Sequence, residues 1–217
     1  MSIKINYITK GLKKTSSNLV LFTDEKFSTN PLKRYISNLE FSYITDLLKS
    51  SDLTKNLFVF ELSSKKKIVL VSIKKNIKNS DIENLGAKLY GRINYGKNSE
   101  YFLNSDSIAI NQKNFVGYFL HGLKLKSYEF NIYKSKKIKN ITTISLIGRQ
   151  SNMFVKNKLK FKALEDGTFF TRDLVSEPGN ILHPDEYAKR LLKLKKFGLK
   201  VTVYNEQKLK KLGMNAL

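Results

Sequence analysis

Residues 171–187 read Thr-Arg-Asp-Leu-Val-Ser-Glu-Pro-Gly-Asn-Ile-Leu-His-Pro-Asp-Glu-Tyr, and the rest of the chain is organised around them. Pro178 disfavours a helical conformation in the residue before it, so a helix is expected to end there. Pro184 suits the first turn of a new helix, where its missing N–H costs nothing. Asp185 and Glu186 then lie at the positive end of that helix's dipole. The stretch therefore predicts a helix end, a rigid turn and a helix start in close succession.

The residues on either side of this stretch continue both helices. Residues 153–176 have a helical pattern whose expected buried side is Phe161, Leu164, Thr168, Thr171, Leu174 and Val175. Gly167 weakens the middle of that helix by about 1 kcal/mol relative to alanine. After Pro184 the pattern predicts a helix over 184–197 that buries Tyr187, Leu191 and Leu194 and is capped by Gly198. A strand at 201–203 and a helix over 206–212 are expected to follow.

Residues 1–150 alternate between strand and helix patterns. The predicted strands are 18–23, 57–62, 67–73, 107–110 and 141–147, and the predicted helices are 38–50, 80–93 and 112–124. The helix at 80 is expected to begin with a capping box, Ser80 to Glu83. The segment 24–38 is expected to be an irregular connection. This alternation predicts an α/β fold.

Three stretches carry a resemblance to one family. Residues 172–184 resemble the Arg-Asp-Leu-Val-Asn-Glu-Pro-x-Asn-x-Leu-Thr-Pro segment that enters the catalytic domain of the leucyl (cytosol) aminopeptidase family of metallopeptidases. Residues 198–217 resemble the next strand of that family and its Leu-Gly-Met-x-Ala-Leu motif. Residues 122–130 resemble its Gly-Leu-x-Leu-x-Ser-Tyr-x-Phe, near the end of the N-terminal domain. Three ordered matches are more specific than any one of them.

The resemblance implies a division of the chain into three parts. Residues 1–150 would form an N-terminal α/β domain similar to macro domains, with a mixed sheet between helices. Residues 151–178 would form a linker helix. Residues 179–217 would form the beginning of an α/β catalytic domain, which we expect to be incomplete in this chain.

The resemblance also implies the chemistry. Members of the family remove N-terminal residues, often leucine, from peptides with two divalent metals such as manganese or zinc, and they assemble as hexamers. Their metal ligands and their catalytic lysine and arginine lie downstream of the Leu-Gly-Met-x-Ala-Leu motif. We therefore assign no catalytic, cofactor-binding or metal-binding residue to this chain, and expect it to be inactive alone. His121 and His183 stand far apart in the sequence, and neither has the spacing of a metal site. His183 replaces the family's threonine near the N-cap, at a cost of roughly 0.5–2 kcal/mol at most.

Two carboxylates at helical spacing, Asp173 and Glu177, resemble a catalytic pair. A structural role is the simpler interpretation, because Arg172 and the backbone at 178–180 offer them partners. We expect Arg172 and Glu177 to join the linker helix to the catalytic domain.

A nucleotide site is not expected in the first domain. Residues 86–91 lack the Gly-Lys-Ser/Thr of a phosphate loop and lie within a helical pattern. After the strand at 67–73 the family usually has Gly-Leu-Gly, whereas Ser72, Ile73 and Lys74 stand here. Because phosphate groups need glycine where backbone N–H groups approach them, ADP-ribose binding is not expected.

The formal net charge is +22 and the isoelectric point is near 9.9, which favours nucleic-acid binding as the alternative function. Only five of the 40 basic residues are arginine, and the charge is spread evenly, with 14 basic and 7 acidic residues in 151–217 and 26 and 11 before them. The lysine-rich and aromatic segment 124–139, with Tyr128, Phe130 and Tyr133, is the best candidate for stacking single-stranded bases. A third interpretation is an assembly module that docks through 184–217.

The remaining composition limits the class of protein. The chain has no cysteine, so disulfides and thiolate sites are absent. Its N-terminus lacks the apolar region of a signal peptide, and no run approaches the roughly 18 apolar residues of a membrane span. A cytoplasmic protein without membrane contact is the expectation.

Overall fold

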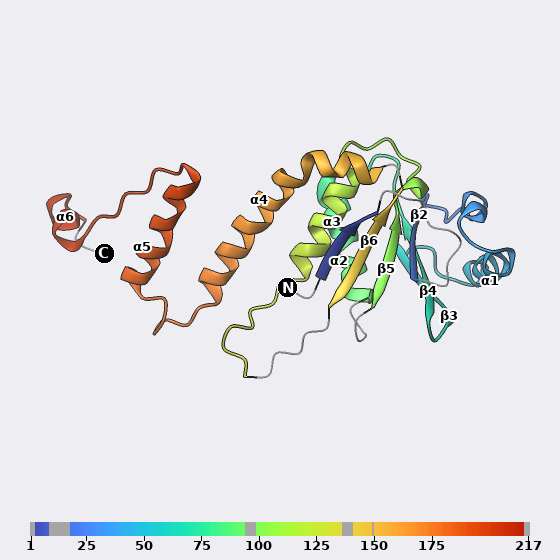
Figure 1. Cartoon of the computed structure of the whole chain (residues 1–217), viewed down its shortest axis with the longest axis horizontal. Coiled ribbons are helices and arrows are strands. Elements are labelled where there is room, and N and C mark those ends of the chain that lie inside the picture. The colour runs from blue at the N-terminus through green and yellow to red at the C-terminus, as the bar shows by residue number, and fades with distance from the viewer. Residues whose placement is uncertain (1–2, 9–17, 94–98, 136–140, 149, 215–217) are drawn as a thin grey trace. The chain divides into compact units, whose positions relative to one another are not determined.

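The structure is a computed structural model that describes residues 3–8, 18–93, 99–135, 141–148 and 150–214, and the side chains of these except for 150–156. The chain divides into two compact units, residues 1–169 and 170–217. Figure 1 traces the elements along the chain. In the first unit, the helices and short 3-10 helices are η1 (Asn30–Arg34), α1 (Asn38–Lys49), α2 (Asn79–Ile93), η2 (Ser105–Ser107) and α3 (Phe115–Lys126).

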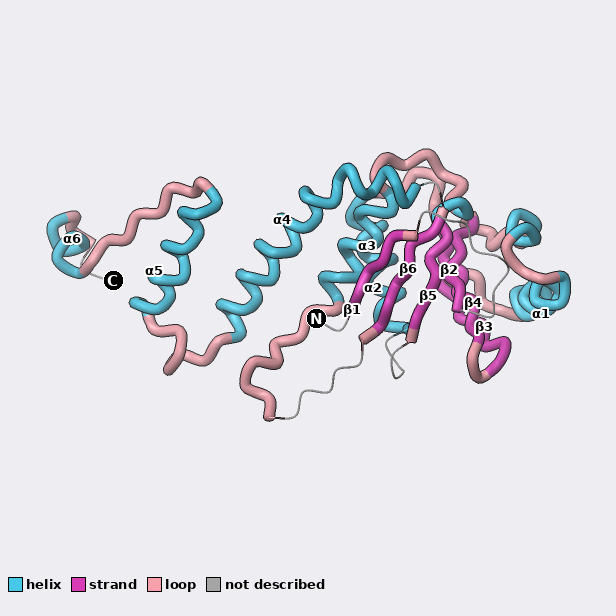
Figure 2. The backbone as a smooth tube through the Cα atoms, in the orientation of Figure 1, coloured by secondary structure: helices cyan, strands magenta, loops and turns pink. Residues whose placement is uncertain are grey.

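The first unit is built on a six-stranded sheet. Its spatial order is β1 (Ile3–Tyr7), β6 (Thr142–Ile147), β5 (Glu100–Asn104), β2 (Asn18–Thr23), β4 (Lys66–Ser72) and β3 (Leu57–Ser63). The first five strands run parallel and β3 pairs antiparallel with β4. The predicted α/β fold with a mixed sheet between helices is confirmed (Figure 2).

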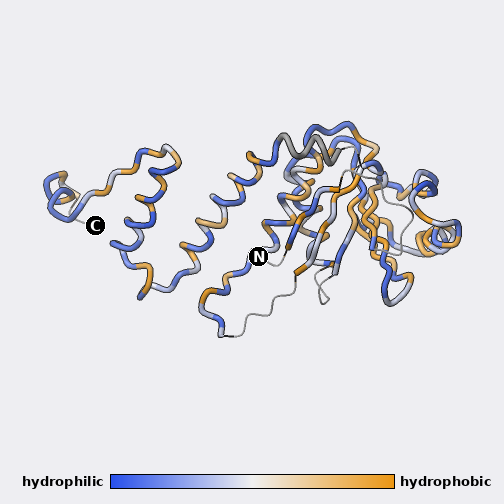
Figure 3. Tube along the Cα trace, viewed as in Figure 1, coloured by the Kyte–Doolittle hydropathy of each residue, from blue (hydrophilic) through white to orange (hydrophobic). Residues whose placement is uncertain are grey.

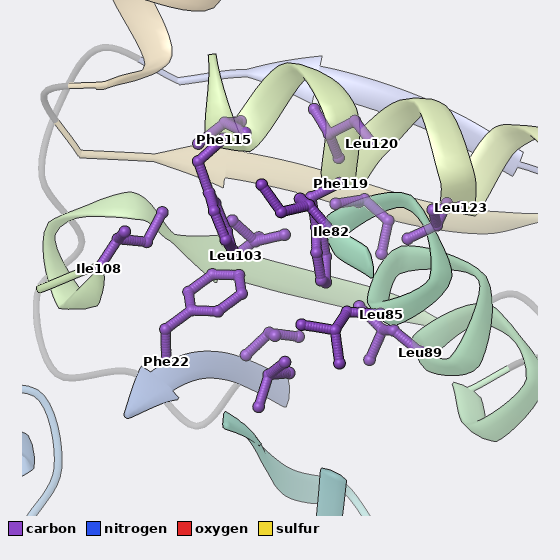
Figure 4. Close-up of a cluster of buried hydrophobic side chains, with 14 of the residues drawn as sticks. Phe22, Ile82, Leu85, Leu89, Leu103, Ile108, Phe115, Phe119, Leu120 and Leu123 are labelled. Carbon is purple, nitrogen blue, oxygen red and sulfur yellow. The ribbon is translucent and has the colours of Figure 1, made fainter. Parts of the chain in front are cut away.

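Two clusters of apolar side chains cover the two faces of this sheet. Alternate residues point to opposite faces, so Val20 and Phe22 join one cluster while Leu21 joins the other. Apolar residues are concentrated in β2, β4 and β3 (Figure 3). The larger cluster contains α2 and α3, and Phe22 meets the rings of Phe115 and Phe119 edge-on (Figure 4). The smaller cluster contains α1 and η1.

Helices α2 and α3 pack unusually closely because glycine lies at both contact points. A Cβ on Gly86 would stand 1.9 Å from the carbonyl oxygen of Phe119. A Cβ on Gly122 would stand 1.9 Å from the carbonyl oxygen of Glu83. No side chain larger than hydrogen fits either position without separating the helices.

Most predicted elements are present. Strands 18–23, 57–62, 67–73 and 141–147 and helices 38–50, 80–93 and 112–124 correspond to β2, β3, β4, β6, α1, α2 and α3. Segment 24–38 is irregular apart from η1. Helix α1 begins with a capping box that the sequence analysis overlooked: Ser37 Oγ accepts a 3.3 Å hydrogen bond from Glu40 N, and Ser37 N donates one of 2.9 Å to Glu40 Oε2.

The prediction of a strand at 107–110 is wrong. The strand is β5, at 100–104, and 105–107 form η2. Local side-chain hydrogen bonds make the turn: Asn104 Oδ1 accepts from Asp106 N at 2.9 Å, and Ser107 Oγ donates to Asn104 O at 2.7 Å. Such bonds compete with strand formation and outweigh the β propensity of Ile108 and Ile110.

Two further details of the first unit differ from expectation. Helix α2 begins at Asn79, so Ser80 lies inside the helix rather than capping it. Strand β1 was not predicted, although Ile3, Ile5 and Tyr7 alternate with polar residues as a half-buried strand requires.

The second unit begins within helix α4 (Gln150–Ser176), which also contributes its first part to the first unit. It continues through α5 (Pro184–Leu192), η3 (Lys193–Phe197) and α6 (Glu206–Lys211). The helix predicted over 184–197 therefore changes to 3-10 geometry at Lys193, and Gly198 ends it with φ 83° as predicted. The predicted domain boundaries near 150 and 178 remain predictions.

Residues 201–203 do not form a strand, because a strand needs a hydrogen-bonded neighbour and the described part of this unit offers none. Tyr187, expected to be buried, is 44% exposed. Among the described residues no helix is both long and apolar enough to cross a membrane.

Candidate functional site

The stretch 171–187 has the predicted local structure. Helix α4 ends at Ser176, directly before Glu177 and Pro178. The carbonyl of Pro178 accepts hydrogen bonds of 2.9 Å from the backbone N–H groups of Ile181 and Leu182, which closes the turn. Helix α5 then begins at Pro184, with His183 at the N-cap in an extended conformation. The side chain of His183 makes no capping hydrogen bond, as its replacement of threonine led us to expect.

Glu177 is held by a residue that the sequence analysis missed. Its Oε1 accepts a 2.9 Å hydrogen bond from Arg190 Nη1, and its side chain is only 4% exposed. Arg190 Nε also donates to Glu186 Oε1 at 3.0 Å. This donation lowers the pKa of Glu186, and the two carboxylates raise the pKa of Arg190. The spacing of Glu186 and Arg190, four residues apart on one helix, was the available signal.

This arrangement does not favour a catalytic carboxylate pair. Glu177 is neutralised by Arg190, and its backbone N–H donates to the carbonyl of Asp173 at 3.1 Å. The structural interpretation of Glu177 is thereby supported, with Arg190 as its partner. The expected contribution of Arg172 remains a prediction.

A second polar cluster lies in the first unit, between α3 and α4. Lys124 Nζ donates a 2.7 Å hydrogen bond to Glu165 Oε2. His121 Nδ1 lies 3.7 Å from Glu165 Oε1, and it is buried without a hydrogen-bond partner. Burial raises the pKa of Tyr7 to about 12, and the charge of Glu165 adds to that rise. Glu165 is 4% exposed, whereas Leu164, expected on the buried side, is 47% exposed.

The described residues do not form a metal centre. Among them, no three histidine, aspartate or glutamate side chains lie close enough together to hold a metal ion. His121 belongs to the first unit and His183 to the second. The side chains present in this part of the chain therefore do not fit the two divalent metals that the resemblance implies.

A hollow of about 660 Å³ lies beside α2, near the carboxyl end of β4. Lys74, Lys88 and Lys126 line it together with Glu25, Asp81 and a mixture of uncharged polar and apolar residues. Residues 86–91 lie inside α2, so they form no phosphate loop. The residues from Ser72 to Lys78 contain no glycine. The expectation that this chain has no ADP-ribose site was based on that sequence.

In the lysine-rich and aromatic segment 124–139, some of the aromatic rings pack against other rings of the protein. Tyr128 stacks on Phe169 with ring centroids 5.5 Å apart, and Phe130 meets Tyr133 at 5.8 Å. Residues 136–140 of this segment lie outside the described residues. Tyr128 is therefore a packing residue in this structure, and Tyr133 is 54% exposed.

Comparisons with known proteins point in one direction. No protein-family model matches the chain. A probable cytosol aminopeptidase of Phytoplasma mali is 36% identical over 130 residues, which cover 57% of this chain and 26% of that protein. One from Brucella suis is 40% identical over 102 residues, 44% of this chain and 20% of that protein. The chain thus spans about a quarter of the length of the curated relatives it matches.

Solved structures agree at the level of the fold. A mutant of tomato leucine aminopeptidase superposes with a TM-score of 0.70 at 16% identity, covering 97% of this chain and 46% of that one. The cytosol aminopeptidase of Coxiella burnetii gives 0.63 at 16% identity, covering 94% and 41%. The resemblance to the N-terminal portion of the leucyl aminopeptidase family is confirmed.

Proposed function

We propose that this chain is the N-terminal portion of a metal-dependent leucyl aminopeptidase, which releases N-terminal amino acids from peptides in the cytoplasm. The observation that carries the proposal is the sequence similarity to cytosol aminopeptidases together with a shared fold over nearly the whole chain. The three ordered motifs at 122–130, 172–184 and 198–217 are consistent with it.

In this proposal the chain contributes no catalytic group. The described residues bring together no set of metal-binding side chains. The two divalent metals, manganese or zinc, and the residues that hold them would belong to the part of the relatives that this chain does not span. When bound, two such metals would activate a water molecule against a peptide carbonyl.

The described residues would have supporting roles. The first unit would be the N-terminal domain of the enzyme, and α4 would lead the chain towards the catalytic domain. The Glu177–Arg190 hydrogen bond would fix the turn after α4, and thus the start of that domain. The whole enzyme would assemble as a hexamer.

A paired assay tests this function. The product of the natural gene and the 217-residue chain are each incubated with manganese and leucine p-nitroanilide, with and without a chelator. We expect release of nitroaniline by the natural product, loss of release with the chelator, and no release by the 217-residue chain. Release by the chain alone would overturn the location of the metal site. No release by the natural product would overturn the activity.

A further inference from the structure

One side of α4 alternates apolar and charged residues where it is buried. Phe161, Glu165 and Phe169 follow one another at intervals of four, so they lie on one face of the helix. Their exposed fractions are 1%, 4% and 7%. A carboxylate therefore stands between two aromatic rings in the middle of a buried stripe.

Each residue of the stripe contacts α3 or the residues just after it. Phe161 lies against Gly117, where a Cβ would stand 2.2 Å from the ring, and meets the ring of Tyr118 edge-on at 5.2 Å. Phe169 stacks on Tyr128.

Glu165 has its partners between these two aromatic contacts. Lys124 donates the 2.7 Å hydrogen bond, and His121 stands beside it. The residue numbers of the partners increase in the same order as those of the stripe. The two helices therefore run parallel in one fixed register.

A shift of α4 by one turn would break this match. Moving α4 by four residues in one direction would place Glu165 against Gly117 and Tyr118. The opposite shift would place it against Tyr128. Either position takes the buried carboxylate away from Lys124, and separating a buried charge from its partner is strongly unfavourable. In the first case Phe169 would also take the place facing Lys124.

We propose that the Lys124–Glu165 pair, with His121 beside it, sets the register of α4 against α3, that is, the position of α4 along the axis of α3. Its purpose is specificity of packing rather than stability, because a buried ion pair often contributes no more than apolar residues of similar volume. Helix α4 carries the chain from the first unit into the second. The Lys124–Glu165 pair therefore determines the residue at which α4 leaves the first unit.

Spin labels measure the register directly, because the chain contains no cysteine of its own. Cysteines replace two exposed residues, Lys126 and Ala163, and the distance between the labels is measured by pulsed electron paramagnetic resonance. A one-turn slip moves α4 by about 5.4 Å along its axis. The free energy of unfolding is measured on the same proteins with urea.

In the otherwise unchanged chain we expect one narrow distribution of distances between the two labels. In the double variant Lys124→Met/Glu165→Leu we expect equal or greater resistance to urea. We also expect the distance distribution to broaden, or to gain a second peak that corresponds to α4 displaced by about one turn. The matched control is Lys162→Met, which breaks an exposed pair with Asp166 on the same helix. It is expected to keep the narrow distance. The charge swap Lys124→Glu/Glu165→Lys is expected to recover it.

Two results would overturn the proposal. A single narrow distance in the apolar double variant would show that packing alone sets the register. Unfolding of that variant would show that the pair is needed for stability. Neither outcome depends on peptidase activity, so the proposal stands or falls apart from the proposed function.

Discussion

Glu177 Oε1 accepts a hydrogen bond of 2.9 Å from Nη1 of Arg190, thirteen residues further along the chain. The bond connects the residue that follows α4 with the last turn of α5, across the turn that Pro178 begins. Because the side chain of Glu177 is 4% exposed, its charge has little water to stabilise it. The hydrogen bond from Arg190 therefore helps to hold the geometry of this joint.

Replacement of Arg190 is expected to loosen the turn. Arg190→Met removes a charged donor from a nearly buried carboxylate, which destabilises the segment that holds it. We expect amide protons of residues 181–190 to exchange severalfold faster in hydrogen-exchange mass spectrometry. Lys189→Met is the control, since Lys189 is 73% exposed and stands 3.9 Å from Glu186. Equal exchange in both variants would contradict the role given to Arg190.

Two glycine substitutions are expected to act in opposite directions. Gly86→Ala inserts a methyl group 1.9 Å from the carbonyl oxygen of Phe119, so α2 and α3 must separate. We expect a loss of about 1–3 kcal/mol in the free energy of unfolding, or more. Gly167→Ala meets no atom within 4 Å and lies inside α4, so we expect a gain of up to about 1 kcal/mol. Urea unfolding measures both, and a neutral Gly86→Ala would refute the close helix contact.

The stability of the first unit is expected to depend on Tyr7 in alkaline solution. Burial, and then the charge of Glu165, raise the pKa of Tyr7 from 10.0 to about 12. Between these values the unfolded chain releases the phenolic proton while the folded chain keeps it. The free energy of unfolding therefore falls as the pH rises through this window.

The variant Tyr7→Phe removes that contribution, so we expect its stability to fall less steeply across the same window. Urea unfolding at several pH values provides the measurement, with Tyr43→Phe, which removes an exposed phenol, as the control. Parallel pH profiles for the Tyr7→Phe variant and the unchanged chain would contradict the assignment.

The positive charge is expected to give only weak binding to nucleic acid. It is distributed over the whole chain, and Tyr128 is engaged with Phe169. We expect no retention on a DNA column even at about 50 mM salt. A dissociation constant that rises linearly with salt on logarithmic axes would instead reveal organised phosphate contacts and favour the alternative function.

The sequence predicted the elements with the clearest periodicity. Helix α1 and strands β4 and β6 are long and strongly patterned, and the prolines at 178 and 184 placed a helix end and a helix start correctly. Polar chemistry was harder to anticipate. Asn104 and Ser107 form a turn where apolar neighbours suggested a strand, because their side chains bond to the local backbone.

The two polar clusters could not be derived from periodicity. An apolar face was assumed for α4, so Leu164 was expected on the buried side and Glu165 was not. Glu165 is buried because Lys124, 41 residues earlier, supplies its partner. Arg190 had a visible partner in Glu186, but its bond to Glu177 depends on the turn between the helices. Pairings of this kind become evident only in three dimensions.

The central claim is that this chain is the front part of a leucyl aminopeptidase whose metal ligands lie beyond it. The most direct test is the nucleotide sequence that follows the codon for Leu217 in the natural gene. We expect the reading frame to continue into a lysine after a strand and a segment similar to Asn-Thr-Asp-Ala-Glu-Gly-Arg, which would supply metal ligands. A stop codon at that position, or a continuation without these residues, would contradict the claim.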